Sequence, residues 1–183
     1  MKKIYLISFI LLLNLTSCAT VHISSDDAQL GEAAIRKFSE YDLFFIKPLV
    51  IDLKIKADYN NEKATKVIEE GLFKELFAVF GVLDPVSEYD PSKPQNTLII
   101  EPTIEKMKSV SGAARVFTGV LAGGSAVVLK TTYIDAETNK IIAAPSFYQQ
   151  ANAWGAAYSV GRSDRAMLDR IASLAASYAQ NNY

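Results

Sequence analysis

The sequence predicts an α+β domain: a sheet of about four mainly antiparallel strands, with two main helices packed on one face. Three observations lead to this prediction. Short stretches that alternate apolar and polar residues indicate strands, two long stretches with helical spacing indicate helices, and the two kinds are mixed along the chain. The expected order is strand, helix, strand, a loop or short helix, two strands and a final helix.

The first half of the predicted domain contains two strands and a helix. Residues 43–46 are continuously apolar and residues 49–56 alternate, with Pro48 marking a bulge or an edge between them. Residues 61–80 carry apolar side chains along one stripe, and Gly81 can end this helix.

The second half contains a strand, a hairpin and a helix. A proline-rich loop covers 84–96, and residues 98–105 then alternate. Residues 125–134 and 141–154 are predicted to pair as a hairpin, because the turn between them begins with an aspartate that can accept amide hydrogens. The last helix begins at Ser163, a favourable cap.

The N-terminus has the layout of a secretory signal peptide. Lys2 and Lys3 supply positive charge, residues 4–13 are apolar apart from one serine, and small residues follow. The apolar stretch is shorter than the ~20 residues that cross a bilayer as a helix. We therefore predict a signal peptide over residues 1–17; the alternatives are an uncleaved anchor or a buried core helix.

Residues 15–18, Leu-Thr-Ser-Cys, resemble the lipobox of bacterial lipoproteins. The resemblance implies cleavage between Ser17 and Cys18, a diacylglyceryl group on the Cys18 sulfur and an acylated amino group. Two or more acyl chains hold a protein durably on a membrane. Ala19, where such families place aspartate for inner-membrane retention, favours the outer membrane facing the periplasm. The alternative is that Cys18 begins a soluble secreted protein.

Three regions follow from this reading: the signal peptide 1–17, a lipidated N-terminus and tether over 18–42, and one α+β periplasmic domain over 43–183. The start of the tether is small and polar, as flexible linkers are, and residues 33–41 are expected to form a short helix.

Composition argues against several functions. Lys2 and Lys3 leave with the signal, so 17 basic residues face 20 acidic ones, and no dense basic cluster supports nucleic-acid binding. The only histidine, His22, lies in the predicted tether, and Cys18 is the only cysteine. We therefore expect no metal site with nitrogen or sulfur ligands, no cofactor, and no Ser-His-Asp or Cys-His catalytic set.

Carboxylates leave an enzyme as an alternative. Glu101 and Glu105 are predicted on one face of a strand, about 13 Å apart by strand rise. A glycosidase pair needs about 5–9.5 Å, so this spacing does not favour one.

Two segments are candidate partner surfaces. Residues 111–130 hold an uncharged stretch with Gly119 and Gly123 four apart and Arg115 at its start. The alternative is a compact turn or short helix packed on the sheet.

The second candidate segment covers residues 147–164, where Tyr148, Trp154 and Tyr158 supply aromatic surface. The same side chains are also ordinary core residues.

The C-terminal half, from Ala114 to Tyr178, resembles uncharacterised bacterial lipoprotein domains of unknown function. The resemblance implies an envelope lipoprotein with a compact α+β domain and transfers no catalytic residue. We expect a non-enzymatic scaffold or accessory component that binds an envelope protein. A hydrolase of envelope polymers and a periplasmic lipid carrier are the alternatives, and the sequence leaves the oligomeric state open.

The first prediction concerns Cys18. Because a serine hydroxyl does not accept the lipid, Cys18→Ser is expected to leave the chain without palmitate and to release it from membranes. Metabolic labelling in the native host, followed by membrane fractionation, checks this. Wild-type protein that takes up no palmitate would contradict it.

Overall fold

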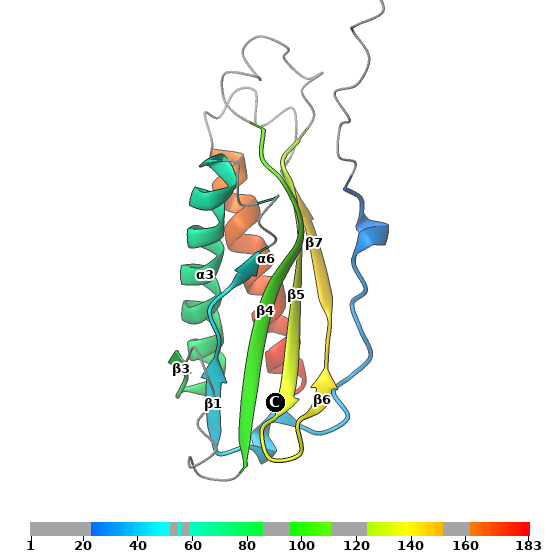
Figure 1. Cartoon of the computed structure of the whole chain (residues 1–183), viewed down its shortest axis with the longest axis vertical. Helices are drawn as coiled ribbons and strands as arrows, with labels where there is room; N and C mark the ends of the chain where they lie inside the picture. The colour runs from blue at the N-terminus through cyan, green and yellow to red at the C-terminus, as the bar shows by residue number, and fades with distance from the viewer. Residues whose placement is uncertain (1–22, 52–54, 56–58, 86–95, 111–123, 152–161) are drawn as a thin grey trace, which may run out of the picture.

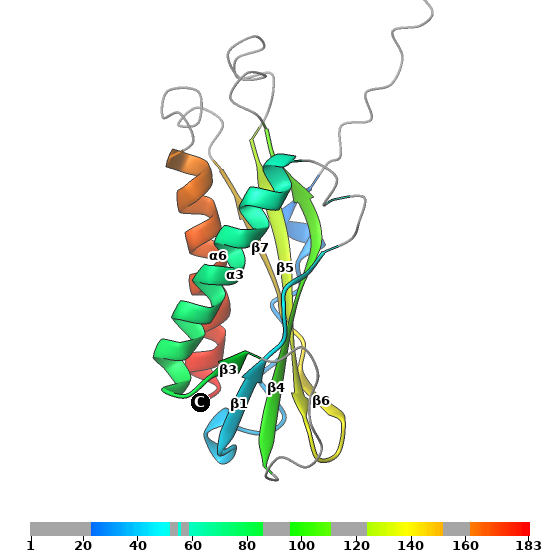
Figure 2. The ribbon, with the colours of Figure 1, turned by 60° about the vertical axis from the view of Figure 1, so that its left-hand side comes forward.

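The computed structural model describes residues 23–51, 55, 59–85, 96–110, 124–151 and 162–183 of the 183-residue chain. Within them, a mixed sheet of seven strands carries two long helices on one face (Figure 1). The view in Figure 2 shows both helices on one side of the sheet and the first described residues on the other side. The class predicted from the sequence, α+β with two helices, is confirmed.

The sheet is built around β4 and β5. Strands β1 and β2 pair with β4 in parallel, β3 pairs with β1 in parallel, and β5 pairs antiparallel with β4, β6 and β7. The strands are β1 (Leu43–Ile46), β2 (Val50–Ile51), β3 (Asp84–Pro85), β4 (Thr97–Lys108), β5 (Ala126–Asp135), β6 (Lys140–Ala143) and β7 (Ser146–Gln150).

The helices are α3 (Tyr59–Phe80) and α6 (Arg162–Asn181), and two short 3-10 turns, η1 (Ser25–Asp27) and η2 (Phe38–Glu40), precede the sheet. Helix α3 ends where predicted. Gly81 adopts a positive φ of 72° and donates its N–H to the Phe77 carbonyl at 2.9 Å, which is the glycine cap of a helix C-terminus.

A bulge keeps the apolar residues of β4 on the helix-facing side. The alternation places Leu98, Ile100 and Ile104 toward the helices, and the pairing with β5 then shifts between Ile104 and Lys106. A bulge adds one residue to one strand. Met107 therefore joins the same core although it is three residues beyond Ile104.

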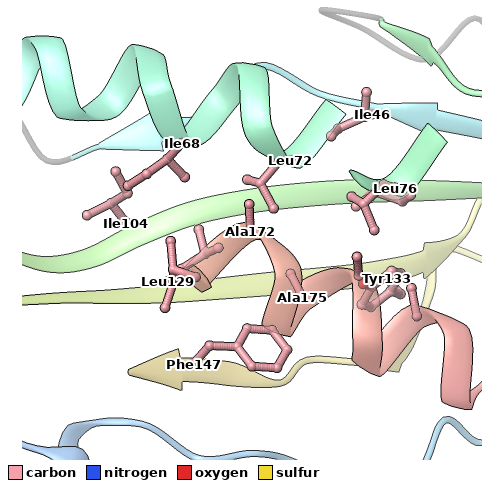
Figure 3. Packing of buried hydrophobic residues seen from close by; sticks show 14 of the residues in the cluster. Ile46, Ile68, Leu72, Leu76, Ile104, Leu129, Tyr133, Phe147, Ala172 and Ala175 are labelled. Carbon is pink, nitrogen blue, oxygen red and sulfur yellow. The ribbon is translucent and has the colours of Figure 1, made fainter. Parts of the chain in front are cut away.

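The core fills the space between the helices and the sheet. Figure 3 shows side chains of α3, α6 and the strands meeting in one cluster. The helices approach closely at Gly71, where an added Cβ would lie 3.2 Å from the Cβ of Ala172. Phe38 stacks on Tyr133 with ring centroids 4.5 Å apart, so an aromatic layer joins the N-terminal segment to β5.

The prediction of about four mainly antiparallel strands is wrong in its detail. The parallel pairs arise because α3 is a crossover between β1 and β4, so both strands run in one direction. The return strand predicted over 141–154 is two strands, β6 and β7. Pro145 lies between them and has no N–H to donate to a continuous ladder.

The segment predicted as a tether lies along the domain from residue 23 onward. Ile23, Phe38 and Tyr41 are buried, and the helix expected over 33–41 is reduced to η2. Backbone hydrogen bonds hold it: the Ile35 N–H donates to the Ile142 carbonyl at 3.1 Å, and the Phe38 N–H to the Asn182 carbonyl at 2.8 Å. A pattern of single apolar residues does not reveal such long-range backbone bonds.

No helix in the described part of the chain is long and apolar enough to cross a membrane.

The second prediction tests whether this segment belongs to the core. Phe38 is fully buried, so Phe38→Ala is expected to lower the free energy of unfolding by about 3–5 kcal/mol. Ile35→Ala is the matched control, because Ile35 is 61% exposed. Urea unfolding of the chain from residue 19 onward measures both. Equal stability of the two variants would show that Phe38 lies outside the core.

Candidate functional site

An apolar groove lies between α3 and the chain that links β1 to β2. Its volume is about 540 Å³, and its apolar walls are Ile46, Pro48, Leu72, Phe73, Pro85 and Pro102. Lys47, Glu69 and Glu70 complete the lining. The residues that line the groove therefore come from α3, from strands β1, β3 and β4, and from the link between β1 and β2.

Prolines and a glutamate shape this groove. Pro48 lies between β1 and β2, and Pro85 ends the edge strand β3; a proline has no N–H with which to extend a ladder. Two backbone donors beside Pro48 are hydrogen-bonded: the Lys47 N–H donates to the Ile100 carbonyl at 2.9 Å, and the Leu49 N–H donates to Glu69 Oε1 at 3.1 Å. The walls are apolar because aliphatic, aromatic and proline side chains line them.

The charges of the groove are unevenly balanced. Lys47 Nζ lies 2.5 Å from Glu101 Oε1 on β4, so the charges of these two side chains balance each other. Glu69 is engaged with the Leu49 N–H, whereas Glu70 is an exposed carboxylate without an ion-pair partner among the described residues. A ligand for the groove would thus meet apolar walls and an acidic rim.

Two phenylalanines extend the apolar surface along α3. The Phe73 and Phe77 rings stack with centroids 6.2 Å apart and an interplanar angle of 24°, and Phe77 is 47% exposed. An exposed stacked aromatic pair beside an apolar groove is typical of an interaction site. We call the groove together with Phe73 and Phe77 the α3 face.

A polar network lies elsewhere, around Arg36. The guanidinium bonds Asp135 Oδ2 at 3.0 Å and Asn96 Oδ1 at 2.8 Å, pairs with Glu40 at 3.2 Å, and lies 4.2 Å from the centre of the Tyr41 ring. It ties the N-terminal segment to the end of β5 and to the start of β4.

Asp135 accepts the hydrogen bonds that hold its turn. Its Oδ1 receives the Thr138 N–H and hydroxyl, both at 2.9 Å, and its Oδ2 receives the Tyr41 hydroxyl at 3.0 Å. Burial alone would raise the pKa of Asp135, but the hydrogen bonds from Thr138, Tyr41 and Arg36 outweigh it and lower that pKa. Burial and the bond to Asp135 raise the pKa of Tyr41 to about 12. The predicted turn role of Asp135 is confirmed.

The two glutamates considered for hydrolysis are engaged separately. Glu101 pairs with Lys47, while Glu105 lies 3.7 Å from Lys130 Nζ and accepts the Ser146 hydroxyl at 3.1 Å. Among the residues that the structure describes, no group of three His, Cys, Asp or Glu side chains could hold a metal ion.

Of the residues predicted to form a partner surface, the structure describes Tyr148. Its ring is half-buried against Ile23, Ala126 and Val128 on the sheet face opposite the helices, and its hydroxyl donates to Gln150 Oε1 at 2.7 Å. Burial raises the pKa of Tyr148. The remaining predicted site residues lie outside the described residues: Ser17, Cys18, Arg115, Gly119, Gly123, Trp154 and Tyr158.

The α3 face was not predicted from the sequence. Two signals were present. Phe73 and Phe77 lie four apart outside the apolar stripe of the helix. Pro48 lies between two predicted strands, Pro85 in the predicted loop and Pro102 within a predicted strand. Neither signal indicated that the segments carrying them meet, because that depends on the parallel pairing of β1 with β3 and β4.

A family model described as a domain of unknown function, DUF4410, matches residues 17–155, most of the chain. The chain belongs to the DUF4410 family. No curated protein matches it.

Several solved structures resemble this DUF4410 protein. PelC from Paraburkholderia phytofirmans, a dodecamer, is 9% identical with a TM-score of 0.46, covering 79% of this chain and 95% of that one. Protein XCC0632 from Xanthomonas campestris, of the DUF330 family, is 8% identical with a TM-score of 0.48, covering 76% and 84%. Protein CT253 from Chlamydia trachomatis is 8% identical with a TM-score of 0.41, covering 77% and 100%.

The third prediction concerns Asp135. A lowered pKa means that the folded state binds fewer protons than the unfolded state, so the contribution of Asp135 is present above about pH 4 and is lost as pH falls through the folded pKa. Asp135→Asn is expected to cost about 1.5–3 kcal/mol at pH 7.

That cost should shrink as the pH falls below about 4, which urea unfolding at several pH values measures. Glu137→Gln, an exposed change in the same turn, serves as control and should have little effect. A cost for Asp135→Asn that stays constant with pH would contradict the role of the ionised carboxylate.

Proposed function

We propose that this DUF4410 protein is a lipid-anchored component of the bacterial envelope that binds another envelope protein through the α3 face and carries out no reaction. The resemblance of residues 15–18 to a lipobox supports the anchor, and Ala19 supports an outer-membrane location facing the periplasm. The observation that carries the binding role is the exposed Phe73–Phe77 stack beside the apolar groove.

The chemistry of the α3 face defines the partner that would fit. Apolar walls favour an apolar side chain or a short apolar segment, since burying such surface contributes roughly 25 cal/mol per Å². Glu70 on the rim favours a partner with a basic residue beside that segment. A protein segment combines both features.

The mechanism is tethering. A domain fixed to a membrane meets membrane-associated partners at a high effective concentration, so a modest intrinsic affinity is sufficient for stable association.

A ligand carrier is the second candidate. The groove volume of about 540 Å³ falls within the range of small-molecule sites, roughly 300–1,000 Å³, and its walls are mostly apolar. Mass spectrometry of organic extracts from the purified protein discriminates between the two. A carrier predicts a stoichiometric lipid or apolar ligand, whereas a protein-binding face predicts none.

A hydrolase is less well supported. Glu101 and Glu105 are held by different lysines, and Asp135 is kept ionised by its hydrogen bonds, which suits a structural carboxylate better than a proton donor.

The fourth prediction tests the α3 face. The double change Phe73→Ser with Phe77→Ser is expected to weaken partner binding tenfold or more, about 1.4 kcal/mol or more, because it removes two aromatic anchors. Lipidated protein is captured from native membranes, and co-purified proteins are quantified by mass spectrometry.

The matched control is Ile141→Ser, which changes a 57% exposed residue on β6, outside the α3 face. The account requires a partner retained by wild type and by this control but lost from the double variant. The same proteins recovered with all three chains would refute the α3 face as the binding site.

A further inference from the structure

We infer that the end of the sheet where β4 ends and β5 begins faces the bilayer and is held within about 18 Å of it. This inference rests on the proposed lipidation of Cys18. The opposite end of the sheet, where β5 ends, then projects away from the membrane.

The position of Ile23 shows where the N-terminal segment joins the sheet. Its side chain is buried against Ala126 and Val128 on the sheet face opposite the helices. Ala126 pairs with Lys108, the last residue of β4, and with Gln150, the last residue of β7. Ile23 therefore lies at the end of the sheet that these three strand termini form, where Figure 1 shows the start of the blue segment.

The segment after Ile23 is fixed to the sheet. Asp27 forms an ion pair with Lys106 on β4, and the Gln29 carbonyl accepts the Ser146 N–H of β7 at 2.6 Å. Within the segment, Asp27 also accepts the Ser24 N–H at 2.9 Å. Because both ends of this stretch are attached, it cannot swing as a flexible linker does.

The chain between Cys18 and Ile23 is short. Cys18 lies five residues before Ile23, and an extended chain spans at most about 3.6 Å per residue, or about 18 Å in total. A free linker of about 25 residues would instead spread over roughly 25–30 Å and leave the domain unoriented. The short link holds one end of the sheet near the lipid.

The remaining geometry then follows from the strands. Strand β4 has 12 residues and so extends about 40 Å, which carries the β5–β6 turn and the C-terminus away from the held end. The groove residue Ile46 pairs with Ile100, eight residues before Lys108, or about 27 Å along β4. The α3 face is therefore presented to neighbouring proteins rather than to lipid headgroups.

Fluorescence energy transfer to lipid tests the orientation. Lipidation consumes the only native thiol, so an introduced cysteine can be labelled alone. Asp26→Cys places the donor near the held end, and Glu137→Cys places it in the turn after β5. The neighbouring Asp27 pairs with Lys106, which lies opposite Val128, and the end of β5 at Asp135 is about 24 Å beyond Val128. Both native side chains are exposed. The lipidated chains are reconstituted into phosphatidylethanolamine–phosphatidylglycerol vesicles with a headgroup-labelled acceptor.

The expected result is severalfold more efficient transfer from Asp26→Cys than from Glu137→Cys. Inserting about 20 Gly and Ser residues between Cys18 and Ile23 should abolish most of this difference, because that linker lets either end approach the lipid. Equal transfer from both sites in the wild-type background overturns the inference, and so does a difference that survives the insertion.

The same samples separate this inference from the proposed function. If mass spectrometry finds no acyl chains on Cys18, the proposed anchor and the orientation fail together. Acylated, vesicle-bound protein with equal transfer from both sites overturns the orientation alone and leaves the anchor intact.

Discussion

The antiparallel pairing of β4 with β5 is the constraint on which the rest of the structure depends. Strands β1 and β2 attach to β4, strands β6 and β7 attach to β5, and both helices pack on the face that these strands share. The bulge after Ile104 keeps that face apolar to the end of the ladder, since without the extra residue Met107 would point away from the helices. One local irregularity thus keeps the end of β4 in the core.

The two faces of this ladder have different roles. One face binds α3 and α6 and makes the core, and the other receives the N-terminal segment through Ile23 and Tyr148. Because the segment continues along the sheet to Phe38 and the Arg36 network, the chain is attached to the domain from residue 23 onward. An anchor at Cys18 would consequently be coupled to the orientation of the fold, whereas a flexible tether would leave them independent.

Much of this arrangement follows from the sequence, and the rest has identifiable physical causes. Helix α3 and its glycine end were predicted because helical spacing and capping are local signals. The parallel pairing of β1 with β4 and the burial of Phe38 depend on contacts between distant residues, which periodicity does not encode. The α3 face was missed for the same reason. Phe73 and Pro85 line the same groove only because the strand order places β3 beside β1, and the sequence pattern does not predict that order.

The proposed function combines an anchored end, a fixed segment and an exposed apolar face, and it requires residues 23–42 to be part of the fold. Native-state hydrogen exchange tests this most directly. We predict that the amides of Ile35 and Phe38, which donate to the Ile142 and Asn182 carbonyls, exchange only through global unfolding, and we predict the same for the amides of β4 and β5. Fast exchange at these two amides while β5 stays protected would show a loose tether and contradict the account.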